Sequence, residues 1–121
     1  MTLLTRSSCI CPGRQLVYEC TVANPQIQFT VWKGSAFDCS SNSNEISLRH
    51  GNFEDTGHEN GICNGGAIFA RITSHDGGQF TSQLTVNTSL DMNGREIQCV
   101  VDDGVGRIVV NASTITLATG I

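Results

Sequence analysis

Short segments in which apolar and polar residues alternate recur along the chain, and they constrain the fold more than any other feature. In the segment 14–22, Leu16, Tyr18, Cys20 and Val22 alternate with a second set that is mostly polar. A side-chain period of two is that of a β-strand with one face buried. No segment sustains the helical period of 3.6 residues. Strands are therefore expected at 14–22, 27–32, 44–50, 66–73, 79–87, 95–101 and 107–117.

Turn-forming residues separate these segments. The sequence Asp-Asp-Gly-Val-Gly at 102–106 predicts a hairpin, and 88–94 predicts a short helical turn. The polar stretch 34–64 reads as loops around one or two short edge strands. Seven or more short strands predict an all-β protein, a two-sheet antiparallel sandwich or a barrel. A length of 121 residues predicts one domain, 1–121, with an ordered core from about 8 to 118.

The charge of the chain argues against nucleic-acid and membrane partners. Its formal net charge is −4, and it has only seven Lys and Arg residues. A nucleic-acid-binding surface or a polybasic membrane patch needs clustered basic residues, which are missing here. No apolar run approaches the length of about 18 residues that spans a bilayer. We expect no nucleic acid among the partners and no membrane insertion by this segment.

The six cysteines indicate an oxidising compartment. They are scattered rather than paired as Cys-x-x-Cys, and His50, His58 and His75 follow no zinc-site spacing. Asn87 and Asn111 each begin an Asn-x-Ser sequon for N-glycosylation. The opening residues are too short and too polar for a signal peptide. The sequence therefore predicts an extracellular, cell-surface or secreted domain cut from a longer chain.

Nothing in the sequence predicts an enzyme, a metal or a cofactor. No Ser lies in a Gly-x-Ser-x-Gly motif, and the Gly-Val-Gly at 104–106 turns between two strands instead of opening a helix. Asp91, Asn93, Asp102 and Asp103 carry calcium-type ligands, but their spacing is not that of an EF-hand loop. We read them as solvated turn residues.

Cys39 and Cys63 bracket the polar stretch, which has little else to hold it. A bridge between them closes a loop of about 25 residues, worth roughly 3.5 kcal/mol in the chain-entropy model. Cys9 and Cys11 either pair with each other in a small ring or join another chain or domain. Six cysteines allow fifteen connectivities, so the sequence leaves the last pair open.

From about Cys11 to Leu117 the chain resembles the immunoglobulin superfamily. The resemblance rests on Cys20, Trp32, the strand ending Leu-Thr-Val-Asn, and "NGREIQC" leading into Cys99. Within the superfamily, "VWKGSAFDC" and "FTSQLTVN" look like immunoglobulin-like domains of invertebrate, especially sponge, cell-surface proteins. The departures are Ile97, where the family usually has a tyrosine, and Asn93, where it usually has an acidic residue.

The resemblance implies an immunoglobulin-like sandwich nearest the variable type. It also implies a disulfide between Cys20 and Cys99 across the two sheets, covered by Trp32 in the core. If Trp32 points inward, Ile27, Phe29 and Val31 lie on the outward face of the same strand. In the superfamily this face often contacts proteins, so these three residues form the expected binding face.

The expected function is recognition of a protein on a cell surface, as in adhesion or receptor binding, with a second copy of the chain as one candidate partner. The first alternative is a structural spacer in a multidomain ectodomain. The second is a glycan or small-ligand binder that uses loops 40–62.

A β-bulge is expected between Asn111 and Ile115. Ile115 and Leu117 should face the core, and in a regular strand Asn111 would then point inward as well. A buried Asn needs hydrogen-bond partners and cannot carry a glycan. One extra residue near 112–114 would turn Asn111 outward.

Overall fold

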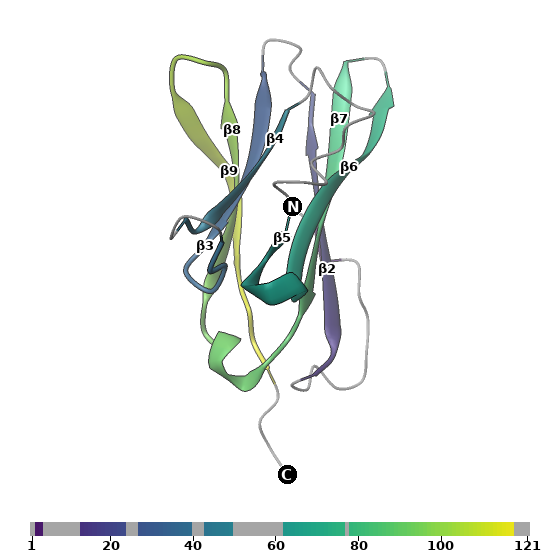
Figure 1. The fold of residues 1–121 in the computed structure, drawn as a ribbon. Helices are drawn as coiled ribbons and strands as arrows, with labels where there is room; N and C mark the ends of the chain where they lie inside the picture. The colour runs from purple at the N-terminus through teal and green to yellow at the C-terminus, as the bar shows by residue number, and fades with distance from the viewer. Residues whose placement is uncertain are drawn as a thin grey trace.

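The computed structural model describes residues 2–3, 13–23, 27–39, 43–49, 62–76 and 78–117, and of residues 2, 3, 75 and 76 only the backbone. Two antiparallel sheets face each other in this part of the chain (Figure 1). The larger has the order β1 (Thr2–Leu3), β2 (Gln15–Val22), β7 (Gln79–Asn87), β6 (Ile68–Asp76), β5 (Ile62–Cys63). The smaller has the order β4 (Glu45–Arg49), β3 (Phe29–Gly34), β8 (Glu96–Asp102), β9 (Arg107–Thr114).

The predicted all-β sandwich is confirmed, and its architecture is immunoglobulin-like. All seven expected strands form, with ends that differ from the expected ones by up to three residues. The predicted helical turn at 88–94 contains the 3-10 turn η4 (Leu90–Met92). β5 lies at the edge of its sheet, within the stretch 34–64 that was predicted to hold one or two short edge strands. The sequence did not predict β1 or the 3-10 turn η3 (Asn64–Gly66). Each of these has only two or three residues, too few to show a period.

The disulfide that the family resemblance implied lies at the centre of the sandwich. Cys20 of β2 is bonded to Cys99 of β8 with a Cα–Cα distance of 6.5 Å, so the disulfide joins the two sheets. Trp32 of β3 lies opposite Cys99 in the ladder and belongs to the same buried cluster. Its indole N–H donates to the hydroxyl of Ser82 on β7, 3.0 Å away. The Trp therefore also ties one sheet to the other.

A third link between the sheets comes from Tyr18 on β2. Its buried phenol is hydrogen-bonded to Ser113 on β9. Burial raises the pKa of Tyr18, and the hydrogen bond to Ser113 offsets part of that rise. The phenol therefore stays neutral at physiological pH.

Cys39 is bonded to Cys63 as well, so the connection after β3 is fixed to β5 of the opposite sheet. Phe37 in that connection is buried in the core. Its ring lies close to Gly34, where a Cβ atom would be 2.7 Å from the ring and 2.8 Å from the carbonyl oxygen of Glu96. Only glycine fits at this position. The stretch that reads as polar loops thus contributes a core residue.

Replacing Cys39 and Cys63 with alanine should lower the free energy of unfolding by about 3.5 kcal/mol, because the unfolded chain regains the entropy of the closed loop. Urea unfolding of the oxidised wild-type protein and the double variant measures this difference. The Cys20–Cys99 bridge stays in place in both proteins and serves as the control. A loss below about 1 kcal/mol would mean that the bridge does little to restrict the unfolded chain.

The expected bulge between Asn111 and Ile115 is wrong. The β8–β9 ladder runs without a shift from the pair Cys99–Asn111 to the pair Glu96–Thr114. The irregularity lies earlier, between Val109 and Asn111, so that Val110 is the extra residue. Asn111 is nevertheless exposed, as is almost all of β9, because β9 is the outer strand of its sheet in the described part of the chain. The side chain of Asn111 lies on the core side of β9, like that of its partner Cys99, and is still exposed because β9 is an outer strand. No bulge is needed to expose Asn111.

Candidate functional site

The expected binding face is not available on the surface. Val31 does point away from Trp32, but its exposed fraction is 0%. Phe29 is half-buried. Ile27 is also half-buried and packs against the core at the end of the sandwich. The expected exposed apolar patch is therefore wrong, whereas binding of a partner by these three residues stays a prediction.

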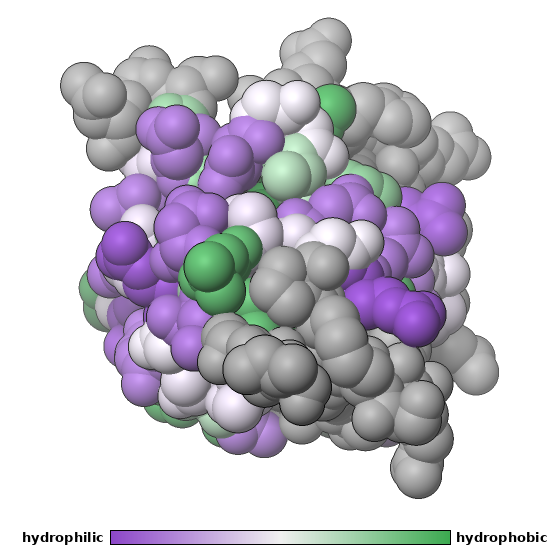
Figure 2. Space-filling view, turned by 90° about the horizontal axis from the view of Figure 1, so that it is seen from below, coloured by the Kyte–Doolittle hydropathy of each residue, from purple (hydrophilic) through white to green (hydrophobic). Residues whose placement is uncertain are grey.

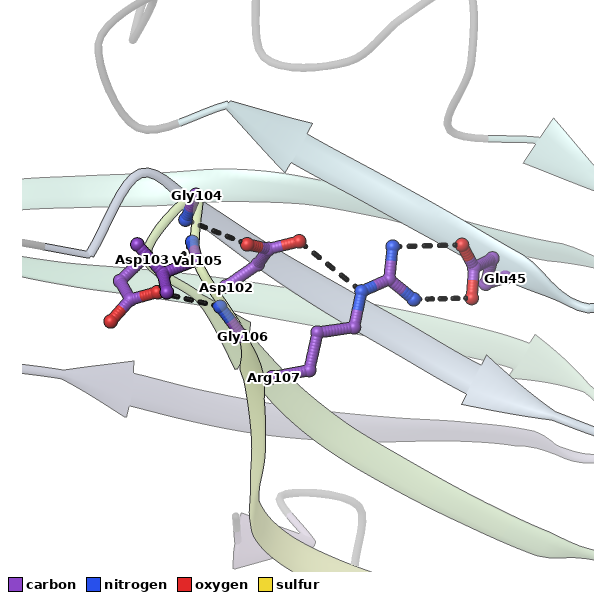
Figure 3. A network of polar contacts seen from close by, with 7 residues as sticks. All are labelled: Glu45, Asp102, Asp103, Gly104, Val105, Gly106 and Arg107. Carbon is purple, nitrogen blue, oxygen red and sulfur yellow. Dashed lines mark hydrogen bonds and ion pairs between the residues drawn. The ribbon is translucent and has the colours of Figure 1, made fainter.

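An ion pair made by the chain itself lies on this outer face. The guanidinium of Arg107 on β9 contacts both carboxylate oxygens of Glu45 on β4, at 2.9 and 3.2 Å, and Asp102 at 3.2 Å (Figure 3). Because β3 and β8 lie between β4 and β9, these side chains meet above the central strands, on the face that carries Val31 and Val100. Long charged side chains cover apolar surface with their methylene groups. The ion pair thus places charged groups on the face that the strand period predicts to be apolar.

Apolar residues are exposed instead on β9 and on the turn before it. The exposed fractions are 95% for Val105, 68% for Ile108, 51% for Val109 and 45% for Val110. We call these four residues the hairpin stripe. Val109 pairs with Val100 and lies on the outer face of the sheet, whereas Ile108 pairs with Val101 and lies on the other face, so the hairpin stripe is apolar on both of its sides. Exposed apolar residues are ordinary when scattered, but several close together mark interaction surfaces more often than chance. The hairpin stripe is the candidate site.

Side-chain hydrogen bonds fix the turn that carries Val105. The Asp103 carboxylate accepts from the backbone N–H groups of Val105 and Gly106, at 2.8 and 3.0 Å. The Asp102 carboxylate accepts from Gly104 at 2.8 Å, and Gly104 has a φ of +89°, which glycine adopts without strain (Figure 3). The predicted hairpin is confirmed, and three hydrogen bonds to the carboxylates of Asp102 and Asp103 hold its tip.

These hydrogen bonds make the turn sensitive to acid. The N–H groups of Gly106 and Val105 hold the pKa of Asp103 below its ordinary value of 3.8. A carboxyl with a lowered folded pKa stabilises the turn fully above the ordinary pKa, and this contribution is lost as the pH falls through the folded value. The amide shifts of Val105 and Gly106 in NMR spectra should therefore titrate with a midpoint below 3.8.

Asp103→Asn should remove this titration and keep the turn, because an amide oxygen still accepts. A peptide of residues 100–109 should titrate near the ordinary value. A midpoint in the folded protein at or above that of the peptide would contradict the hydrogen-bond pattern.

An open apolar groove of about 630 Å³ lies beside the same hairpin. Its lining includes Val22 and Val101, which are buried, and the half-buried Ile27. Ile108 and Val110 of the hairpin stripe line it as well. The groove lies at the end of the sandwich where β2 finishes and β9 starts.

The opposite end of the sandwich is different in character. Figure 2 shows this end, and most of its described surface is hydrophilic. Leu90 on η4 is an isolated exposed apolar residue, with an exposed fraction of 60%. Asp91 and Asn93 lie at this end, whereas Asp102 and Asp103 lie at the hairpin end (Figure 1). The fold does not bring these four residues together, and the described residues contain no cluster of three or more potential metal ligands.

Both sequon asparagines are exposed. Asn87 ends β7, where its side-chain oxygen accepts from Gln15 at 3.3 Å. Asn111 lies on β9, next to the hairpin stripe, and its side-chain oxygen accepts from the N–H of Ala112 at 2.8 Å. Glycosylation at either site stays a prediction.

Several predictions fall outside the described residues. They concern Cys9 and Cys11, whose pairing stays open, and most of loops 40–62, of which only 43–49 and 62 are described. Among the described residues, no helix has the length and apolar character that crossing a membrane requires.

Comparison with known protein families, curated proteins and solved structures gave no significant match to this chain. The class is therefore stated from the structure alone. The chain is an immunoglobulin-like, disulfide-linked β-sandwich that presents an apolar hairpin at one end.

Proposed function

We propose that this chain is an extracellular protein-recognition domain of the immunoglobulin superfamily, nearest the variable type, from a cell-surface adhesion or receptor protein. The observation that carries the proposal is the hairpin stripe, which exposes three apolar side chains on β9 and a fourth, Val105, on a hydrogen-bonded turn. A domain that served only as a spacer has no need of such a surface. The two described disulfides fit an oxidising compartment.

The magnitudes favour weak binding by a single domain. Fully burying one such side chain contributes about 1.5–3 kcal/mol, so the four contribute at most roughly 6–12 kcal/mol. Association costs about 4–15 kcal/mol. Such a contact becomes effective where many copies act together, as they do on a cell surface.

The test is binding of the chain, secreted with its disulfides intact and joined into tetramers, to a panel of extracellular proteins displayed on cells. The panel includes the chain itself. The wild-type tetramer should bind at least one member specifically. Val109→Asp should reduce this signal at least tenfold, because it places a charge in the middle of the hairpin stripe.

Leu90→Asp is the matched control, because it changes an apolar residue of similar exposure at the opposite end of the sandwich. It should bind as the wild type does. Both variants should unfold within about 0.5 kcal/mol of the wild type, since both sites are on the surface. Binding that survives Val109→Asp, or no binding to any member of the panel, would count against the proposal.

A further inference from the structure

A row of side chains crosses the outer face of the larger sheet beside Asn87. Thr85 of β7 pairs with Val17 of β2 on one side and with Phe69 of β6 on the other. Phe69 pairs in turn with Ile62 of β5. These four side chains point away from the core, because the residues next to them along each strand are buried. Ile62 is exposed, and Val17 and Phe69 are half-buried, so this outer row is partly open to solvent.

Asn87 lies within reach of the outer row. It follows Thr85 by two residues on β7, so both side chains are on the same face of the sheet. Because Phe69 pairs with Thr85, Phe69 is the diagonal neighbour of Asn87 on β6. Diagonal neighbours of this kind lie about 7–8 Å apart, which an aromatic side chain can span. A group attached to the Asn87 side chain is thus placed beside the ring of Phe69.

The side-chain amide of Asn87 has its nitrogen towards β6. Its oxygen accepts from the Nε2 of Gln15 on β2 at 3.3 Å, whereas its nitrogen lies 3.5 Å from the carbonyl oxygen of Ala67, the residue before β6. The same carbonyl accepts from the backbone N–H of Asn87 at 2.7 Å. An N-glycosylated amide keeps its oxygen and one N–H. Both side-chain contacts can therefore persist when a sugar is attached.

From these observations we infer that Asn87 carries an N-linked oligosaccharide and that its first N-acetylglucosamine packs on the ring of Phe69. The C–H groups on one face of a pyranose ring form an apolar surface, and the negative face of an aromatic ring attracts such groups. The sequon names the occupant of the outer row, because the sugar is tethered beside it. This inference rests on the proposed function, since N-glycosylation is a modification of secreted proteins.

The oligosaccharide is attached before the domain folds. In the folded chain Thr88 of the sequon is buried, and the hydroxyl of Ser89 is hydrogen-bonded to Asp91, so a transferase cannot reach the sequon in an extended form. The donor is an oligosaccharide on a polyprenyl diphosphate. The bond from Asn87 Nδ2 to the anomeric carbon forms as the bond from that carbon to the diphosphate oxygen breaks. The lipid diphosphate leaves, and the amide nitrogen loses one proton.

The second sequon has different neighbours. Asn111 pairs with Cys99 on β8, and the residues on either side of Cys99 on the same face are Ile97 and Val101. All three are buried, and none of these described neighbours is aromatic. An oligosaccharide at Asn111 therefore lacks the contact that Phe69 offers at Asn87, and Asn111 provides the matched control.

The test begins with secretion of the whole chain, behind a signal peptide, from cells that attach oligomannose oligosaccharides. Peptide mass spectrometry should find Asn87 occupied in most molecules. Endoglycosidase H then trims each oligosaccharide to a single N-acetylglucosamine, which should preserve the melting temperature. Asn87→Gln should melt at least about 2 °C lower than the trimmed wild type, whereas Asn111→Gln should melt within about 1 °C of it.

Phe69→Leu separates the contact with the ring from other effects of the sugar. Leucine keeps this position apolar, so the variant should fold. When Phe69→Leu is present, adding Asn87→Gln should change the melting temperature by less than about 1 °C. NMR spectra of the trimmed wild type should also show sugar protons shifted upfield by the ring current of Phe69. This shift should be absent from Phe69→Leu.

An unoccupied Asn87 would overturn the inference, and so would sugar proton shifts that are equal in the wild type and Phe69→Leu. Either result leaves recognition by the hairpin stripe intact, because Asn87 pairs with Gln15 at the start of β2, at the other end of the sandwich. Tetramers of Asn87→Gln should bind the panel as the wild type does. An occupied Asn87 in a chain that binds no panel member would overturn the recognition function alone, and a wild-type chain that is not secreted would contradict both.

Discussion

Replacing both Cys20 and Cys99 with alanine should lower the free energy of unfolding by about 4.5 kcal/mol. The two residues are 79 positions apart, and opening a loop of that size returns a large conformational entropy to the unfolded chain. Typical domains are stable by only about 5–15 kcal/mol, so the variant should lose roughly 30% or more of its stability. Urea unfolding of the oxidised proteins at equal concentration gives the difference.

The double variant at Cys39 and Cys63 provides the comparison for this result. It removes the smaller loop, so its loss should be about 1 kcal/mol less. If removal of the Cys39–Cys63 bridge lowered the free energy of unfolding more than removal of the Cys20–Cys99 bridge, loop size would not determine how much each bridge stabilises the protein. The chain-entropy account of both bridges would then be wrong.

Trp32→Ala should cost about 3–5 kcal/mol, because it leaves a large cavity in the middle of the core. Trp32 is fully buried in the cluster that contains both ends of the Cys20–Cys99 bridge. Near-ultraviolet circular dichroism and urea unfolding together report the loss of packing and of stability. A cost below about 1 kcal/mol would show that Trp32 is not a central packing residue.

Two further variants separate the ring from its hydrogen bond. Trp32→Phe keeps an aromatic ring but leaves the hydroxyl of the buried Ser82 without the indole N–H, which should cost about 1–3 kcal/mol. Adding Ser82→Ala removes the unpaired hydroxyl and should recover part of that loss. No recovery would mean that the hydrogen bond adds little to the packing.

The strands could be predicted from the sequence because the period of two is a local property. Where one face of a strand is buried, its alternation appears directly in the sequence, as it does from Leu16 to Val22. The bridge from Cys20 to Cys99 followed from a family resemblance rather than from any local pattern. The strand β1 and the exact place of β5 lie beyond such reasoning, because each of these strands pairs through only two residues.

The candidate site was harder to predict, because it depends on contacts between distant parts of the chain. The prediction that Val31 points away from the core was correct. The Arg107–Glu45 ion pair on the same face could not be predicted, because it joins residues 62 positions apart. The bulge at Val110 lies on the predicted strand, yet its exact place depends on the pairing with β8. One signal for the site was present: the run Ile108-Val109-Val110 breaks the alternation beside a glycine-rich turn.

The central claim is that the hairpin stripe contacts a protein partner. Hydrogen–deuterium exchange of the tetramerised chain, free and bound to the panel protein that it selects, tests this claim most directly. Amides in residues 104–110 should exchange more slowly in the complex, and those around Leu90 should not change. Slower exchange around Leu90 with no change at 104–110 would place the contact at the other end of the sandwich and contradict the account.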